Sequence, residues 1–393
     1  MKNRILRALF LVSVAAVAAP VPDPVPSRPP DSALRAWADA AWTRVMATFY
    51  SPKTGNIYAT TPDKVSPAKD FPGGLLKPGL GYGRGLEDCA INGGVALSGL
   101  VDKWLATRDA SVSADAEKVA RGLLNLETAH PYRGFVARGL CVEDGTSICR
   151  LTSRDQVTHW YHGLNRYYWS GLAPETVKAE IRQAFVDVAA RMERNVTKEN
   201  NWNFLQADGT MDPRGICKMR ETYPHEAARL AMCYALAWKV SGDAKWRKAY
   251  HALRDEALDG SCALATAPEK LVRGLMPDYA LIQMNTSLEA ILDVEEEGAF
   301  RVRAIDAMVI CARLAQRRAP GRKGDETRWL CGCAELHLAQ MMVPRDAFAY
   351  GTSQQTLLAN AIVQIPAASA SSIRCCHLFA AYWRARRLGY FAD

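Results

Sequence analysis

One helix-forming segment in the first half of the chain carries polar side chains that could do acid–base chemistry. At intervals of four, three and four residues, one face of this helix would hold Asp155, His159, His162 and Arg166. Its other faces are apolar or aromatic, so we expect a buried helix whose polar stripe faces a cavity. We predict that Asp155, His159 and His162 are catalytic, because carboxylates and imidazoles are common proton carriers. These residue types also suit a metal ion, but an Asp–His hydrogen bond or a ligand-facing wall is the stronger expectation, and no metal is predicted.

A second candidate precedes the next helix upstream. The glycine-rich stretch 81–86 leads directly to Glu87 and Asp88, which would lie in the first turn of a helix. Glycine allows the backbone to approach a ligand closely. Acids in a first turn also cap a helix, and the sequence alone leaves both interpretations open. We predict Asp88 as a second catalytic carboxylate and Glu87 as a binding residue.

A third group lies around the start of a helix predicted over residues 222–241. His225 opens this helix, and Trp202 lies among asparagines in the preceding loop. Aromatic rings next to amides suit a sugar, because the ring offers an apolar face and the amides bond to hydroxyls. We therefore expect both residues to bind substrate.

Arginines are frequent in the predicted loops. Arginine captures a carboxylate or sulfate with two parallel hydrogen bonds, and we predict Arg138, Arg154 and Arg220 to bind an anionic substrate. Gln156 is assigned to the same set. Gln156 also stands three residues after Ser153, the spacing of a capping box at the start of the helix.

The elements that must position these residues are helical. Apolar residues recur with a helical period and strand signals are almost absent. The pattern predicts helices over 32–49, 87–106, 113–128, 153–170, 174–194, 222–241, 243–258, 277–293, 298–315, 326–342, 353–364 and 370–388.

The connections between these helices alternate in length. Long loops follow the odd-numbered helices and tight turns follow the even-numbered ones over most of the chain, so neighbours are antiparallel and the long loops gather at one end. This predicts an all-α fold, an (α/α)6 toroid of six helical hairpins with long loops on one face. If the even-numbered helices form the inner ring, their positive N-terminal ends point into the loop-lined funnel. An open helical solenoid is the alternative, but no fixed repeat is visible.

The N-terminus has the pattern of a secretory signal. A basic start and an apolar run end in a small-residue site, so residues 1–18 are predicted to be a signal peptide. A proline-rich linker follows over 19–31, and residues 32–393 form the toroid domain. We expect a periplasmic or secreted protein. No later segment is apolar enough to suggest a membrane partner, and a formal charge of +8 without a basic–aromatic cluster does not indicate nucleic acid.

Eleven cysteines suggest some pairing in an oxidising compartment. Cys141 and Cys149 flank a turn-like segment, so a local bridge is expected there, while Cys233 and Cys311 fall on apolar helix faces and are expected to be buried thiols. No phosphate loop or dinucleotide fingerprint occurs, and no cofactor is predicted.

With these features the chain resembles the six-hairpin glycosidase superfamily and is most similar to the unsaturated glucuronyl and rhamnogalacturonyl hydrolases. The resemblance is architectural over about residues 32–390 and extends to motifs only around Asp88 and Asp155, which are 67 residues apart. It implies that the two aspartates protonate, and activate water against, the vinyl ether of an unsaturated uronic acid. Asp155 would be the general acid/base and Asp88 its essential partner.

Three functions remain open at this level. The first is an exported glycoside hydrolase acting on acidic oligosaccharides or polysaccharides through two carboxylates. The second is a polysaccharide lyase on the same scaffold, for which His159, His162, Tyr161 and either Arg154 or Arg138 could serve. The third is a non-catalytic sugar-binding or scaffold protein. The oligomeric state is left open as well.

Overall fold

The computed structural model describes residues 27–268, 272, 276–321 and 326–392. The predicted signal peptide and most of the predicted linker lie outside these residues. The long helices are α1 Asp31–Arg44, α2 Cys89–Thr107, α3 Val112–Thr128, α4 Arg154–Trp169, α5 Glu175–Asn195, α6 Arg229–Ser241, α7 Ala244–Cys262, α9 Asp278–Leu292, α10 Ala299–Arg318, α11 Glu326–Met341, α12 Thr352–Gln364 and α13 Ser372–Arg387. Short helical turns cover Val45–Phe49, Pro62–Lys64, Ala68–Asp70, Pro72–Gly74, Pro224–Glu226, Ala263–Thr266, Ala319–Gly321 and Ala367–Ser369.

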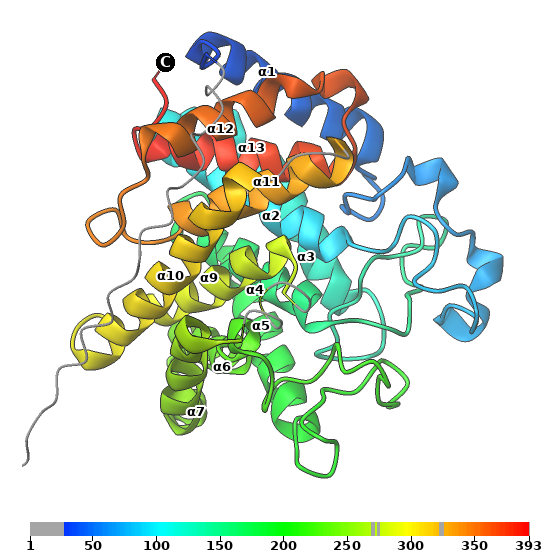
Figure 1. The fold of residues 1–393 in the computed structure, drawn as a ribbon. Coiled ribbons are helices and arrows are strands. Elements are labelled where there is room, and N and C mark those ends of the chain that lie inside the picture. The colour runs from blue at the N-terminus through cyan, green and yellow to red at the C-terminus, as the bar shows by residue number, and fades with distance from the viewer. Residues whose placement is uncertain (1–26, 269–271, 273–275, 322–325, 393) are drawn as a thin grey trace, which may run out of the picture.

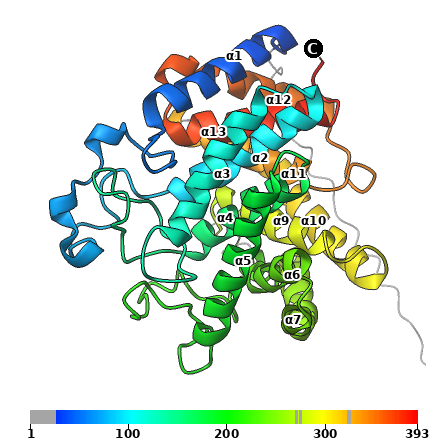
Figure 2. The ribbon, with the colours of Figure 1, turned by 180° about the vertical axis from the view of Figure 1, so that it is seen from behind.

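Six of the helices form a closed inner ring. Helices α2, α4, α6, α9, α11 and α13 each contact the next, and α13 packs against α2, which closes the circle. The helices α1, α3, α5, α7, α10 and α12 lie outside them (Figures 1 and 2). Burial separates the two sets, because 12 of the 16 residues in α4 are buried but only 7 of the 21 in its outer neighbour α5. The predicted all-α toroid is confirmed.

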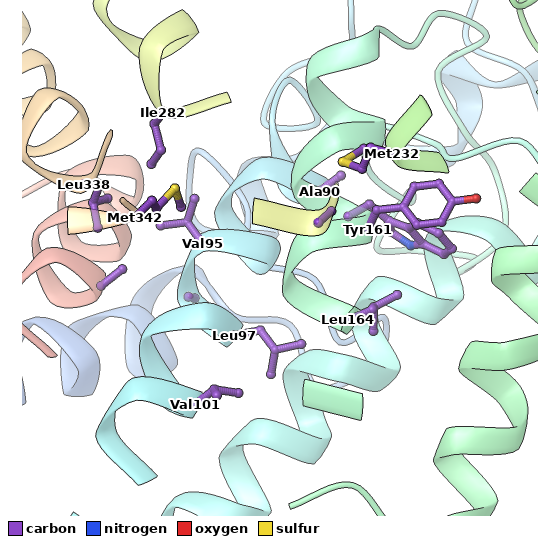
Figure 3. Packing of buried hydrophobic residues seen from close by; sticks show 14 of the residues in the cluster. Ala90, Val95, Leu97, Val101, Tyr161, Leu164, Met232, Ile282, Leu338 and Met342 are labelled. Atoms are coloured by element: carbon purple, nitrogen blue, oxygen red, sulfur yellow. The ribbon is translucent and has the colours of Figure 1, made fainter. Parts of the chain in front are cut away.

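Glycines allow the inner helices to cross at very short distance. A Cβ added at Gly94 of α2 would lie 2.1 Å from the carbonyl oxygen of His159 in α4. A Cβ at Gly163 would in turn lie 2.7 Å from the Cα of Gly94. Apolar side chains from α2, α4, α6, α9 and α11 belong to one core cluster in the interior of the ring (Figure 3). The crossing therefore fixes the depth of His159 in the ring.

The long loops gather at one end of the ring, as the alternation of lengths predicts (Figure 1). They are folded around a small core of their own. This loop core consists of Tyr58, Val65, Phe71, Leu76, Leu86, Cys89, Cys141 and Cys149. An isolated bridge between Leu75 and Ile148 connects the first two long loops, and another between Leu140 and Ile148 lies within the second. The residues that approach the inner helices from these loops are thus held by packing.

The predicted Cys141–Cys149 bridge is wrong, because both thiols are free and buried. Each points to a different backbone carbonyl: Cys141 Sγ lies 3.7 Å from the oxygen of Ser66, and Cys149 Sγ lies 3.9 Å from that of Gly81. Burial raises the pKa of both thiols. In this loop core the two cysteines act as small apolar side chains, as Cys233 and Cys311 do in the ring.

Two helix starts differ from prediction. The helix expected from residue 222 begins as a long helix only at Arg229, after a short turn over Pro224–Glu226. The capping box at Ser153 is not formed, since this residue makes no side-chain cap and Gln156 binds elsewhere. Among the described residues, no helix combines the length and apolar character needed to cross a membrane.

Candidate active site

A cavity of 280 Å³ opens at the loop end of the ring, where the inner helices have their N-termini. We call it the loop-end cavity. It is lined by Tyr82, Asp88, Ile91, Arg138, Ser153, Asp155, His159, Ile216, Tyr279, Gln283, Glu335, Ile373 and His377. The structure therefore brings together four of the residues predicted from sequence, namely Asp88, Arg138, Asp155 and His159.

Asp88 is held by two donors from different loops and helices. Arg138 Nη1 lies 3.3 Å and Gln156 Nε2 lies 2.8 Å from its Oδ1. Asp88 precedes α2 but makes no side-chain cap, so the helix-capping interpretation does not hold for it. Burial raises its pKa, although Arg138 and Gln156 oppose the shift. Asp88 is thus the more easily protonated carboxyl of the pair.

The pKa of Asp155 is shifted in the opposite direction to that of Asp88. Its Oδ1 forms an ion pair with Nη1 of Arg229, a guanidinium that is 1% exposed. The other terminal nitrogen of Arg229 donates to Oε1 of Gln283 at 2.6 Å, which holds the guanidinium in place. Burial opposes ionisation of Asp155, but Arg229 outweighs it and the pKa of Asp155 is lowered. Asp155 is therefore kept ionised.

Two histidines from non-adjacent helices line the same cavity. His159 comes from α4 and His377 from α13, and Nε2 of His377 has no hydrogen-bond partner among the described residues. Burial lowers the pKa of His159 well below its ordinary value and that of His377 to about 4. The Nδ1 of His377 lies 3.4 Å from a carboxylate oxygen of Glu335. Burial therefore favours the neutral form of both imidazoles.

Sequence reasoning missed several of these residues, including Tyr279, Glu335 and His377. Each lies in the first three turns of a predicted inner helix, the part that faces the loop end. Their position on the inner ring was the available signal, but each is an isolated polar residue without a motif around it.

His162 was predicted to be catalytic together with His159, but the structure places it outside the loop-end cavity. Its Nε2 lies 2.8 Å from Oε2 of Glu289, and it lines a separate cavity nearer the short turns. His162 lies three residues beyond His159 on the same stripe, and this step along the axis carries it past the floor of the loop-end cavity. The metal interpretation, which needed Asp155, His159 and His162 together, loses its third ligand. In the described part of the chain, no three metal-ligating side chains come together.

Two of the arginines assigned to substrate binding are neutralised within the protein. Arg154 Nε donates to Glu226 at 2.7 Å and also binds backbone carbonyls. Arg220 pairs with Glu256 at 3.0 Å and lies 4.4 Å from the ring centroid of Trp202. Neither these arginines nor Trp202 lines the loop-end cavity.

The remaining predicted residues lie around the cavity without lining it. Glu87 contributes its backbone carbonyl, which accepts from Arg138 at 2.6 Å and from Gln156 at 3.1 Å. Gln156 is fully buried and therefore positions Asp88 from behind. His225 is stacked on Tyr223 with ring centroids 5.7 Å apart.

Tyr161, considered for a lyase, is also outside the cavity. Its hydroxyl donates to the carbonyl of Phe185 at 3.0 Å, and its ring packs against the ring of the same residue. It is a core residue between α4 and α5. The tyrosines that do line the cavity are Tyr82 and Tyr279.

Comparison with known proteins gives one informative result. No family model and no curated protein matches the chain. Among solved structures, a sugar epimerase from a ruminal bacterium has a similar fold, with a TM-score of 0.55 and 10% sequence identity. The similarity covers 92% of this chain and 99% of the epimerase. At this identity the likeness concerns the fold alone: the chain shares its helical architecture with that protein.

Proposed function

We propose that the protein is a carbohydrate-active enzyme that hydrolyses acidic oligosaccharides in the loop-end cavity. One observation carries the proposal: Asp88 and Asp155 line the same cavity, and their pKa values are shifted in opposite directions. Two carboxyl groups with separated pKa values can act together as proton donor and charged partner. The fold of a sugar-processing enzyme agrees with a carbohydrate substrate.

The directions of the shifts assign the roles. Asp88, with the raised pKa, is the proton donor, whereas the sequence resemblance implies this role for Asp155. Asp155 stays ionised beside Arg229 and supports the positive charge or the attacking water in the transition state. Arg229 and Gln283 position Asp155, and Gln156 positions Asp88.

The position of Arg138 is an argument for an acidic substrate. It is the arginine of the predicted substrate-binding set that lines the cavity, and its guanidinium lies 3.8 Å from the ring centroid of Tyr82. A sugar carboxylate could pair with this cation. Tyr279, which is 43% exposed, offers an aromatic surface for a sugar ring.

The proposal is tested by turnover of uronic-acid polysaccharides and their unsaturated oligosaccharides, followed by the ultraviolet absorbance of the C4–C5 double bond. A loss of absorbance supports the proposal if its rate is about 10²–10⁴-fold lower in Asp88→Asn and in Asp155→Asn. Glu256→Gln is the control, since Glu256 pairs with Arg220 outside the cavity. A rise in absorbance indicates a lyase. No loss of absorbance and no release of reducing ends from any acidic substrate overturns the proposal.

A second candidate function rests on the two neutral histidines. His159 and His377 line one cavity from different helices and could remove and return a proton at a sugar carbon. This chemistry serves an epimerase or a lyase, and the similar solved structure is a sugar epimerase.

Proton exchange separates the two candidates. In deuterated water, an epimerase incorporates deuterium at a sugar carbon, and His377→Ala abolishes the incorporation. A hydrolase acting through the aspartates leaves the carbon-bound hydrogens of a saturated sugar unexchanged. On an unsaturated sugar it adds deuterium only at C4, together with loss of the double bond. Nuclear magnetic resonance spectra of the products distinguish these results.

We further propose that the protein is exported. The basic start and apolar run over residues 1–18 support this localisation. Fractionation of the source cells and N-terminal sequencing of the mature chain test it, and a cytoplasmic protein that keeps these residues contradicts it.

A further inference from the structure

The ring has a second cavity of 280 Å³ at its other end, where the inner helices have their C-termini. We call it the turn-end cavity. Residues from α2, α4, α6, α9 and α13 line it. On α4, Asp155 lines the first cavity and Trp169 the second, and their separation along the helix is about 21 Å at about 1.5 Å per residue. A ligand in the turn-end cavity therefore does not compete with one at Asp155.

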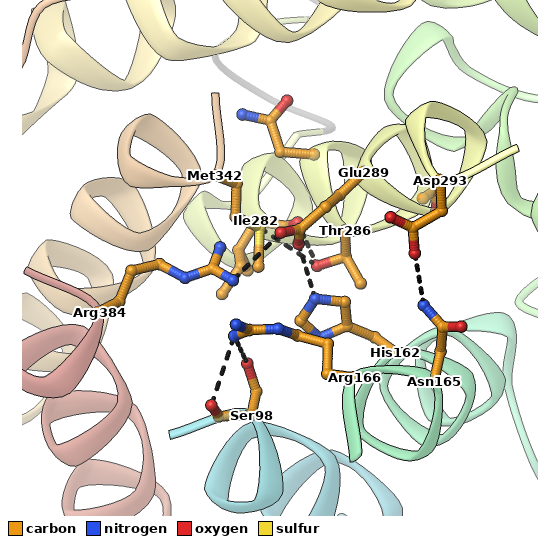
Figure 4. Close-up of polar contacts among 12 residues, drawn as sticks. Ser98, His162, Asn165, Arg166, Ile282, Thr286, Glu289, Asp293, Met342 and Arg384 are labelled. Atoms are coloured by element: carbon orange, nitrogen blue, oxygen red, sulfur yellow. Dashed lines mark hydrogen bonds and ion pairs between the residues drawn. The ribbon is translucent and has the colours of Figure 1, made fainter. Parts of the chain in front are cut away.

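The floor of this cavity is a fixed polar network (Figure 4). Glu289 accepts from His162 at 2.8 Å and from Arg384 at 3.2 Å. Asn165 donates to Asp293 at 2.7 Å, while its own Oδ1 is buried without a partner among the described residues. Asn165 and His162 are each 3% exposed, so these groups are held in place before any ligand arrives.

An exposed aromatic ring stands at the rim. Trp169 is 52% exposed, a high value for a tryptophan. It is held by Tyr168, whose ring centroid lies 4.8 Å away at a steep angle, and by Lys239, whose ammonium lies 4.8 Å from the ring centroid. The exposed ring of Trp169 thus offers a flat apolar face beside the polar groups of the cavity.

The cavity presents both kinds of hydrogen-bonding group. Arg166, Lys239 and Arg387 are donors, and Glu289 and Asp293 are acceptors. Opposite charges are nearly balanced, so the site is not built for a highly charged anion. Sugar hydroxyls both donate and accept, and the apolar face of a sugar ring stacks on an aromatic side chain.

We propose that the turn-end cavity is a second carbohydrate-binding site that holds one sugar ring of a polysaccharide chain against Trp169. The cavity is at the lower end of the size range of small-molecule sites, which suits a single ring. The site anchors the polymer at the face opposite the loop-end cavity, and its binding does not depend on the reaction performed there.

Affinity electrophoresis of the full chain tests the site. Native gels contain xylan, dextran or polygalacturonate, so that neutral and acidic polymers are compared. We expect at least one polymer to retard the protein, and Trp169→Ala to raise the apparent Kd about tenfold, which is about 1.4 kcal/mol. Trp169→Phe should keep part of the affinity, because it retains an aromatic face.

Two controls make the result specific. Glu256→Gln, which alters a residue outside both cavities, and Val302→Ala, which alters a 57% exposed apolar residue on α10, should bind the polymers as the unchanged protein does. Thermal melting of each variant confirms folding. Equal retardation of Trp169→Ala, or no retardation by any of the polymers, overturns the inference. Because binding is read without turnover, the proposed hydrolysis can fail while this site stands.

Discussion

The two ends of the inner ring use acidic residues in different ways. At the loop end, the side chains of Asp88 and Asp155 are 37% and 27% exposed, and each pairs with a single arginine. Towards the turn end, Asp102 is 1% exposed and is bound by Arg166, Arg384 and Arg387. A ligand can reach the carboxylates at the loop end, whereas the carboxylate of Asp102 is buried and inaccessible to a ligand.

Helix polarity accounts for part of this difference. The inner helices point their positive N-termini to the loop end and their negative C-termini to the turn end. The last turns of α4 and α13 accordingly carry Arg166, Arg384 and Arg387. These cations then require a buried anion, and Asp102 supplies it. The comparison teaches that the same residue type is structural where cations surround it and available for chemistry where they do not.

Removing the sealed carboxylate should give the largest effect. Asp102→Asn leaves three arginines without their anion, and we expect a loss of about 3–5 kcal/mol in the free energy of unfolding. Urea denaturation followed by circular dichroism measures it. Asp88→Asn is the matched control and should change stability by less than about 1 kcal/mol, because burial already favours its neutral form. If both variants lose equally, the contrast between the two ends is wrong.

The second largest effect that we expect is a loss of stability at the turn end in acid. Burial opposes ionisation of Asp102 and Glu289, but the neighbouring arginines outweigh it and the pKa of each is lowered. Groups with a lowered pKa stabilise the fold above their unfolded values of about 4 and lose that contribution as pH falls. We expect the free energy of unfolding to drop by at least about 1.4 kcal/mol between pH 5 and pH 3.

The contribution of Asp88 to the free energy of unfolding should change in the opposite direction as pH falls, because its raised pKa favours the protonated form in the folded state. The buried histidines also have lowered pKa values, so they destabilise the fold from about pH 6.5 down to their folded pKa values and add to the drop in this window. Comparison with Asp102→Asn therefore isolates the share of this carboxylate. In Asp102→Asn the drop between pH 5 and pH 3 should be smaller. An identical drop in this variant would assign the acid sensitivity to other groups.

The smallest effect that we expect is a change in the pKa of Asp88. Gln156 donates to this carboxylate and thereby lowers its pKa against the effect of burial. Gln156→Leu should raise the pKa of Asp88 and move the alkaline limb of the turnover profile upward by up to about one pH unit. Gln283→Leu, which loses the contact with Arg229 behind Asp155, should leave that limb in place. A downward shift in Gln156→Leu would contradict Asp88 as proton donor.

The sequence predicted the architecture well, because helical periodicity and alternating loop lengths are local signals. It also predicted Asp88 and Asp155, which stand at the starts of consecutive inner helices and line the same cavity. Periodicity gives direction around a helix but not depth along its axis, and this is why His162 was placed in the wrong cavity. His377 was missed because only ring closure brings it to Asp88, 289 residues earlier in the chain.

The contact between α13 and α2 that closes the ring also sets the order in which the protein can be completed. During synthesis, α13 can pack against α2 only after roughly 280 further residues have been added. This takes about 15–55 s at about 5–20 residues per second. During this time the apolar interior of the growing ring lacks its final wall. Deletion of the last helix is therefore expected to leave an aggregation-prone chain, and partial synthesis to yield no native intermediate that already contains the loop-end cavity.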